Sequence, residues 1–164
     1  MREPVTAYVA LGANLGDARA ALLQAVRGLE NLPCTQVRRV SSIYKTAPLN
    51  IDSAMDTAAP GLDYLNAVVE INTGLNAPAL LDQLQRLEQE AGRERPYRNA
   101  PRTLDMDLLL YGSGRIASDR LQLPHPRMQQ RAFVLVPLAE IAPDQVGAEA
   151  LEAVRHQAVQ KLSA

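Results

Sequence analysis

A chain of 164 residues is long enough for one domain with a proper hydrophobic core and too short for two of ordinary size, so we expect a single domain over residues 1–164. A formal net charge of −1 argues against a bulk nucleic-acid binder or a membrane-surface binder, and the longest apolar runs are too short to cross a bilayer. The N-terminus does not resemble a signal peptide, and one cysteine, Cys34, cannot form an internal disulfide, which favours a reducing cytoplasm.

Hydrophobic periodicity predicts the first elements in the order βαββαβ. They are a strand over 5–11, a helix over 18–31, strands over 37–46 and 64–72, a helix over 77–91 and a strand that starts near Leu104. Asp17 is the expected cap of the first helix and Gly92 the expected stop of the second. This order is the split βαβ or ferredoxin-like plan, an α+β fold in which two helices cover one face of an antiparallel sheet.

Residues 115–164 extend this plan. We expect a short strand near 120–123, a helix near 129–141 and a last helix near 148–162. The helix over 18–31 should bury Ala18, Leu22, Ala25, Val26 and Leu29. The helix over 77–91 should bury Leu80, Leu81, Leu84 and Leu87. Two long irregular segments, 47–63 and 92–103, are typical of functional loops rather than simple connections.

The most informative residues are two aspartates in the last strand of the βαββαβ series. Leu104, Met106, Leu108 and Leu110 alternate with Asp105 and Asp107, so a strand would bury the apolar residues and place both carboxylates on the opposite face. Two like charges roughly 6–7 Å apart along a strand need a neutralising partner. Carboxylates completed by water and substrate phosphates usually hold Mg²⁺, so the pair predicts a site for two divalent cations.

Arginines surround this pair. Segment 92–103 holds Arg93, Arg95, Arg98 and Arg102, and Arg115, Arg120, His125, Arg127 and Arg131 follow. Arginine grips phosphate oxygens in a planar, bidentate way, and the chain lacks a GxxxxGK[ST] phosphate loop, so arginines and metal would have to hold a nucleotide. These features favour phosphoryl or pyrophosphoryl transfer by positioning and charge neutralisation.

Six separated motifs together resemble the 6-hydroxymethyl-7,8-dihydropterin pyrophosphokinases of folate biosynthesis. They are residues 10–15 (ALGANL), 44–49 (YKTAPL), 63–66 (DYLN), 88–92 (EQEAG), 98–109 (RNAPRTLDMDLL) and 123–125 (LPH), with 137–143 (PLAEIAP) closing the similarity. The resemblance implies an ATP-dependent transferase with a ferredoxin-like fold and two Mg²⁺ ions. It would transfer pyrophosphate from ATP to the hydroxymethyl group of the pterin, with AMP as the other product.

The resemblance also implies roles for individual residues. Asp105 and Asp107 would hold both metal ions between the pterin hydroxyl and the ATP phosphates. Arg93 and Arg95 would lie on a mobile catalytic loop, Arg95 and Arg98 would reach the ATP phosphates, and Arg102 would lie near the reaction centre. The catalytic set is therefore Arg93, Arg95, Arg102, Asp105 and Asp107. Further ATP-contacting positions are Gln85, Glu88, Leu108, Arg120, His125 and Arg131.

A flat, polar pterin ring is best held by aromatic stacking on its faces and amide hydrogen bonds at its edge. By resemblance, Phe133 and Tyr64 are the stacking pair. Asn66 lies two residues after Tyr64, hence on the same strand face, and offers both a donor and an acceptor to the ring edge. Loop contacts would come from Thr46, Ala47, Pro48 and Leu49.

Two other classes of function fit part of this pattern. A different two-metal enzyme on the same fold plan, such as a nucleotidyl transferase or cyclase, would also need paired carboxylates. A ferredoxin-like RNA-binding domain would need exposed aromatics on its sheet, and this chain has five Tyr and one Phe. The resemblance favours the pyrophosphokinase, with ATP and 6-hydroxymethyl-7,8-dihydropterin as small-molecule substrates. From charge and cysteine usage we expect no nucleic-acid or membrane partner and a place in the cytoplasm, and a monomer is the default expectation.

Overall fold

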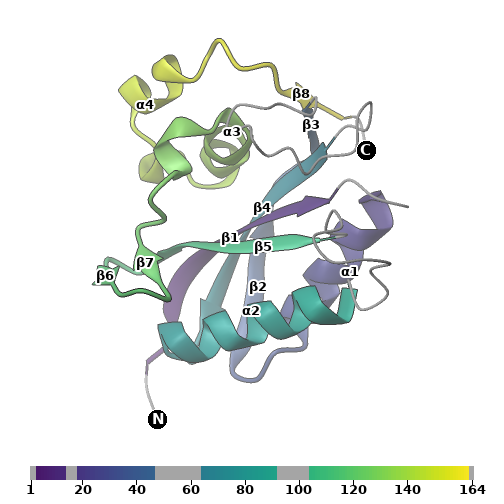
Figure 1. Ribbon diagram of the computed structural model, residues 1–164, viewed down its shortest axis with the longest axis vertical. Coiled ribbons are helices and arrows are strands. Elements are labelled where there is room, and N and C mark those ends of the chain that lie inside the picture. The colour runs from purple at the N-terminus through teal and green to yellow at the C-terminus, as the bar shows by residue number, and fades with distance from the viewer. Residues whose placement is uncertain (1–2, 14–17, 47–63, 92–103, 163–164) are drawn as a thin grey trace.

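The computed structural model describes residues 3–13, 18–46, 64–91 and 104–162 (Figure 1). Their main feature is an antiparallel sheet with strand order β5-β1-β4-β3-β8, in which β2 also pairs with β4. The strands are β1 (Val5–Ala13), β2 (Thr35–Val40), β3 (Tyr44–Thr46), β4 (Tyr64–Thr73), β5 (Asp105–Tyr111) and β8 (Gln160–Lys161). The ferredoxin-like α+β fold expected from the sequence is confirmed, because β1 and β4 lie at the centre and β5 forms one edge.

Helices α1 (Ala18–Glu30) and α2 (Ala77–Ala91) cover one face of the sheet. Between them and the strands lies the first core, which includes Leu22, Leu29, Leu80 and Leu84. Asn76 caps α2, since its Oδ1 accepts a hydrogen bond from the backbone N–H of Ala79 at 2.8 Å. The expected inward faces are confirmed except for Leu81, which is half-buried outside this core.

The two helices approach each other closely at Gly28. A Cβ atom at this position would lie 2.8 Å from Leu87 Cδ2, so any larger residue would push the helices apart or displace the leucine. Glycine in mid-helix normally destabilises a helix, and here it allows close packing instead.

The opposite face of the sheet carries α3 (Ala132–Ile141) and α4 (Ala148–Ala153), which lie above the sheet in Figure 1. Between them and the strands lies the second core, which includes Tyr8, Val68, Leu109, Leu135 and Leu138. The short strands β6 (Ile116–Ala117) and β7 (Gln122–Leu123) form a separate two-stranded hairpin between β5 and α3. No helix among the described residues is long and apolar enough to cross a membrane.

Strand β5 departs from the strict alternation expected for it. Its pairing with β1 shifts between Tyr8 and Val9, so Leu109 is an extra residue with no partner in the register, as in a β-bulge. Leu104, Met106 and Leu108 face the first core as expected, but Leu109 and Leu110 both face the second. The expectation that Leu110 shares a face with Leu108 is therefore wrong, because the bulge reverses the alternation after Leu108.

Three expected boundaries also need correction. The expected strand over 37–46 is two strands, interrupted at Ser41, whose Oγ accepts a hydrogen bond from Val68 N–H at 2.9 Å. The expected helix near 129–141 is a short 3-10 turn over Met128–Gln130 followed by α3. The expected helix over 148–162 ends at Ala153, because the later residues return to the sheet, where β8 pairs with β3. The Asp17 cap and the Gly92 stop lie outside the described residues.

Candidate active site

The carboxylates and the amide singled out in the sequence project from one face of the sheet. Gly12 of β1 pairs with Asn66 of β4 on one side and with Asp105 of β5 on the other. Directly paired residues in antiparallel strands point to the same face, so Asp105 and Asn66 share a face, roughly 10 Å apart at ordinary strand spacing. We call it the active-site face.

The second aspartate lies on the same face, one pair further along. Asp107 pairs with Ala10, and Ala10 pairs with Val68, which belongs to the second core. The active-site face therefore changes from polar to apolar within two residue pairs. Asp105 and Asp107 are both half-buried, so their carboxylates are reachable while their strand is fixed by packing.

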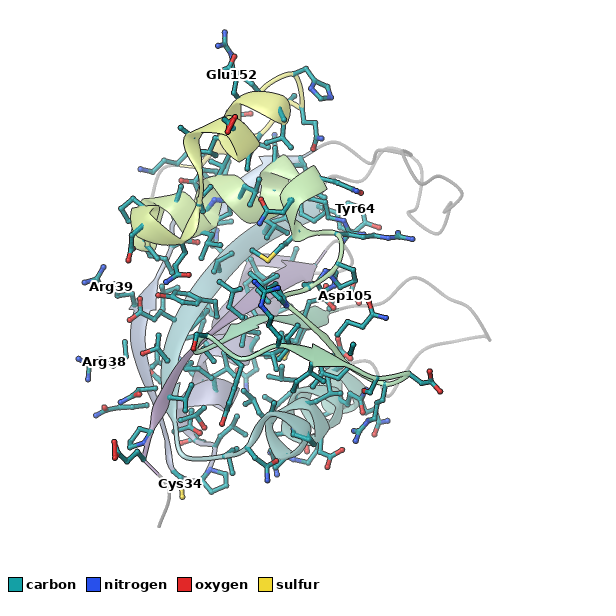
Figure 2. All side chains as sticks on the ribbon, turned by 90° about the vertical axis from the view of Figure 1, so that its left-hand side faces the viewer. Cys34, Arg38, Arg39, Tyr64, Asp105 and Glu152 are labelled. Atoms are coloured by element: carbon teal, nitrogen blue, oxygen red, sulfur yellow. The ribbon has the colours of Figure 1, made fainter. Side chains whose placement is uncertain are left out.

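Asn66 is almost completely buried, and its amide is oriented by its neighbours. Its Nδ2 donates a hydrogen bond to Thr46 Oγ1 at 3.1 Å. Its Oδ1 faces Gly12, where a Cβ atom would lie only 3.3 Å away. Thr46 pairs with Tyr64, so the predicted pterin residues Thr46, Tyr64 and Asn66 are brought together at the junction of β3 and β4. Figure 2 shows Tyr64 and Asp105 on the same side of the molecule, with Arg38 and Arg39 on the other side.

His125 joins the aspartate strand from the segment after β7. Its backbone N–H donates to the Leu109 carbonyl at 3.0 Å, and its Nδ1 accepts from the Arg127 N–H at 3.1 Å. Burial lowers the pKa of His125; Asp107 opposes this shift, and Arg131 and Arg127 add to it. The neutral ring therefore carries its proton on Nε2, which makes that nitrogen a hydrogen-bond donor.

The first turn of α3 supplies two more predicted residues. Arg131 is the residue before the helix, in an extended conformation, and Phe133 is the second helical residue. The Arg131 guanidinium carbon lies 5.4 Å from the centroid of the Phe133 ring, within the range of a cation–π contact. Phe133 packs against the edge of the second core and is half-buried, so part of its ring remains exposed.

Glu88, a predicted ATP-contacting residue, has a structural contact that the sequence did not reveal. Its Oε2 accepts a hydrogen bond from the Met106 N–H at 2.6 Å, between the two aspartates. This amide is available because β5 is an edge strand of the sheet. Glu88 thus ties helix α2 to the strand that carries both carboxylates.

Of the remaining predicted site residues, the structure describes Arg120, Gln85 and Leu108. Arg120 donates to Gln85 at 3.2 Å and also pairs with Asp82, so Arg120 and Gln85 are brought together between the hairpin and α2. The side chain of Leu108 is buried in the first core, so a ligand at this position would contact its backbone. Arg93, Arg95, Arg98, Arg102, Ala47, Pro48 and Leu49 lie outside the described residues.

Sequence reasoning missed the residues that hold this site together. Glu140 of α3 accepts hydrogen bonds from Ser42 N–H, Ser42 Oγ and Tyr44 Oη at 3.0, 2.9 and 2.7 Å. Gln157 contacts the start of α3 from the C-terminal segment. A glutamate late in an otherwise apolar helix was a weak sequence signal for the role of Glu140. No signal in the sequence indicated a role for Gln157.

Comparisons with known proteins identify relatives of the whole chain. Residues 8–143 match the model of the family described as 7,8-dihydro-6-hydroxymethylpterin-pyrophosphokinase (HPPK). The chain is 44% identical over 151 residues to a Bacillus subtilis protein named 2-amino-4-hydroxy-6-hydroxymethyldihydropteridine pyrophosphokinase, covering 92% of this chain and 86% of that one. A protein of the same name from Haemophilus influenzae is 45% identical over 142 residues, covering 87% and 84% of the two chains.

Solved structures show the same fold. A crystal structure titled as HPPK-DHPS in complex with substrates aligns with a TM-score of 0.67 at 14% identity, covering 93% of this chain and 42% of that one. A Plasmodium falciparum HPPK-DHPS with pterin and p-hydroxybenzoate aligns with a TM-score of 0.63 at 13% identity, covering 87% and 40%. The chain thus spans about two fifths of the length of these structures.

Proposed function

Because the chain belongs to the 7,8-dihydro-6-hydroxymethylpterin-pyrophosphokinase family, we propose that it transfers pyrophosphate from ATP to 6-hydroxymethyl-7,8-dihydropterin. The products are AMP and the pterin diphosphate, which makes the chain an ATP-dependent transferase of folate biosynthesis. The pterin hydroxyl oxygen attacks the β-phosphorus of ATP, the bond from that phosphorus to the bridging oxygen of the α-phosphate breaks, and the hydroxyl proton is released. The observation that supports the proposal most directly is the row Asp105–Gly12–Asn66, which brings the carboxylate that we propose for the metal and the amide that we propose for the pterin ring to one face.

The donor set fits magnesium. Two half-buried carboxylates, Asp105 and Asp107, project from one strand face, and no cluster of three or more His, Cys, Asp or Glu side chains able to hold a metal occurs among the described residues. A site of this kind is completed by water and by substrate phosphates, as is usual for Mg²⁺. When bound, two Mg²⁺ ions would neutralise charge on the attacking and leaving oxygens.

The residues around the aspartates suit an ATP polyphosphate. His125 offers the Nε2–H donor described above, and Arg131, whose charge helps to lower the pKa of His125, offers a guanidinium. Gln85, Glu88, Leu108 and Arg120 line the α2 side of β5 and complete the proposed ATP contacts. From segment 92–103, we propose that Arg93, Arg95 and Arg102 act at the reaction centre and that Arg95 and Arg98 hold phosphates, on the basis of the family motif alone.

The proposed pterin site lies between β4 and the start of α3. Tyr64 and Phe133 would stack on the two faces of the ring, and Asn66 would bind its edge. The bond from Asn66 to Thr46 uses one of its two amide protons, so one donor and the carbonyl oxygen remain to recognise the ring. Thr46, Ala47, Pro48 and Leu49 would supply the remaining contacts.

We further propose that residues 1–164 act as one domain, as a monomer in the cytoplasm. An exposed thiol at Cys34 is consistent with a reducing compartment. A gel-filtration experiment coupled to light scattering tests the monomer directly.

The deciding experiment measures products. Purified protein is incubated with ATP, Mg²⁺ and 6-hydroxymethyl-7,8-dihydropterin, and nucleotides and pterins are followed by chromatography with mass detection. We expect AMP and pterin diphosphate in equal amounts, and neither product when pterin or Mg²⁺ is left out. ADP in place of AMP would indicate single phosphoryl transfer, and incorporation or cyclisation of AMP would indicate a nucleotidyl transferase or cyclase. Either result would contradict the proposal.

A further inference from the structure

The side chain of Gln157 bridges the two sides of Arg131 at the start of α3. Its Oε1 accepts a hydrogen bond from the Ala132 N–H at 2.9 Å, and its Nε2 donates to the Gln130 carbonyl at 2.9 Å. One amide therefore fixes the backbone immediately before and immediately after Arg131. These bonds span 25 and 27 positions along the chain.

This contact replaces a cap that α3 lacks locally. The first N–H groups of a helix have no partner within the helix, and a side chain just before the helix usually accepts one of them. Arg131 occupies that position and its side chain makes no capping hydrogen bond. Gln157 supplies the missing acceptor from the C-terminal segment instead.

Gln157 is itself held in place from both directions. Its backbone N–H donates to the carbonyl of Val154, whose side chain is buried in the second core. On the other side, Val159 packs against the same core and β8 pairs with β3, which leads into Thr46. The amide is thus presented to α3 from a fixed segment.

We infer that Gln157 is a positioning residue for substrate binding, which holds Arg131 and Phe133 in the orientation that receives ATP and pterin. The inference rests on the proposed function of these two residues. Gln157 lies beyond residues 8–143, the part of the chain that matches the family model, so the inference gives a role in the site to a segment outside that match.

Gln157 would position Arg131 and Phe133 by keeping the first turn of α3 in one conformation. Without the Gln157 bridge, the first turn of α3 samples other conformations, and each substrate must reorder it on binding. The penalty is bounded by the usual cost of losing a helix cap, so the KM for the pterin should rise about fivefold, which corresponds to about 1 kcal/mol. The KM for ATP should also rise, because Arg131 would be held less firmly.

The test compares Gln157→Ala with Gln160→Ala, a matched control on the same segment whose side chain is exposed on β8. We expect the fivefold rise in KM for the pterin in Gln157→Ala, a kcat within about twofold of the parent protein, and no change in Gln160→Ala. Loss of folded protein lowers the apparent kcat and leaves KM unchanged. A variant that melts earlier but keeps its KM would therefore overturn the inference in favour of a purely structural role.

Two further measurements separate this inference from the proposed function. Hydrogen exchange of the Ala132 amide needs no activity, and we expect protection in the parent and in Gln160→Ala but not in Gln157→Ala. Equal protection in all three would refute the bridge even if the enzyme is active. Gln157→Glu keeps the acceptor for Ala132 and loses the donor to Gln130, so its KM should fall between those of the parent and Gln157→Ala.

Discussion

Replacing Glu140 with alanine should destabilise the protein markedly, although Glu140 is exposed. Its carboxylate accepts three hydrogen bonds, two from Ser42 in the connection between β2 and β3 and one from Tyr44 at the start of β3. Tyr44, one of the donors, is 6% exposed and pairs with Asn66 in the sheet. Glu140→Ala therefore disconnects α3 from the strand next to the proposed pterin site.

The size of the effect follows from these three bonds. A net contribution of about 1 kcal/mol for each bond is appropriate for an acceptor that water can reach, which gives a loss of about 3 kcal/mol in the free energy of unfolding. For a chain of this length, 1 kcal/mol shifts Tm by roughly 2–4 °C. The expected decrease in Tm is therefore about 6–12 °C.

The pH dependence of the same contact has a definite sign. Burial alone would raise the pKa of Glu140, but hydrogen bonds from Tyr44 and Ser42 hold it below its ordinary value of 4.5. A carboxylate with a lowered pKa in the folded state stabilises the protein above its unfolded pKa, and this stabilisation is lost as pH falls through the folded value. The stability difference between the parent and Glu140→Ala should therefore shrink below about pH 4.5.

Thermal unfolding followed by circular dichroism measures both effects. Glu152→Ala is the matched control, because Glu152 makes one exposed ion pair with Arg155 at 2.9 Å and should cost at most about 0.5 kcal/mol. If Glu140→Ala and Glu152→Ala melt within about 2 °C of each other at pH 7, the reasoning about this contact is wrong.

Three further predictions concern activity. Asp107→Asn keeps the shape of the side chain and removes its charge, so kcat should fall at least about a hundredfold, and an unchanged rate of AMP formation would refute the metal assignment. Gly12→Ala places a Cβ atom 3.3 Å from Asn66 Oδ1 and should raise the KM for the pterin, whereas Gly147→Ala, where a Cβ meets nothing within 4 Å, should not change it. Arg95→Ala should lower kcat far more than it weakens ATP binding, and equal losses in both would instead indicate a clamp on bound ATP.

The βαββαβ core could be predicted from the sequence because its periodic patterns are long. Helix α2 begins and ends where its pattern predicts, over Ala77–Ala91, since a capping asparagine precedes it and Leu80, Leu84 and Leu87 mark one face. The aspartate strand was equally clear, because apolar and acidic residues alternate from Leu104 to Leu108.

The features that could not be predicted, the bulge in β5 and the early end of α4, depend on tertiary contacts. Nothing in the run Leu108-Leu109-Leu110 indicates which leucine is the extra one, because all three are apolar and both faces of the sheet are covered. The helical pattern after Ala153 is overridden by the capping of α3 by Gln157 and by the pairing of β8 with β3. Residues that act through one hydrogen bond to a distant backbone leave no periodic signal in the sequence.

The same limit applies to the site. Strand alternation in the sequence places Asp105 with Asp107 and Tyr64 with Asn66, but only the strand register in the structure brings these two pairs and Thr46 to one face. The bond from the Met106 amide to Glu88 could not be predicted, because it joins a helix to a strand edge 18 positions away. A motif marks which residues matter, and the structure adds the contacts that hold those residues in place.

The bulge at Leu109 has a consequence for how substrates and stability are linked. The inserted residue puts Leu110 beside Leu109 on the face that carries Asp105 and Asp107, so an acidic half and an apolar half of β5 share one face and the proposed substrate site adjoins the second core. Substrates bound beside the two aspartates would pack against the second core and so stabilise the folded state. Saturation at 100 times Kd should then add about 2.7 kcal/mol to the free energy of unfolding, so the melting temperature becomes a direct readout of ligand occupancy.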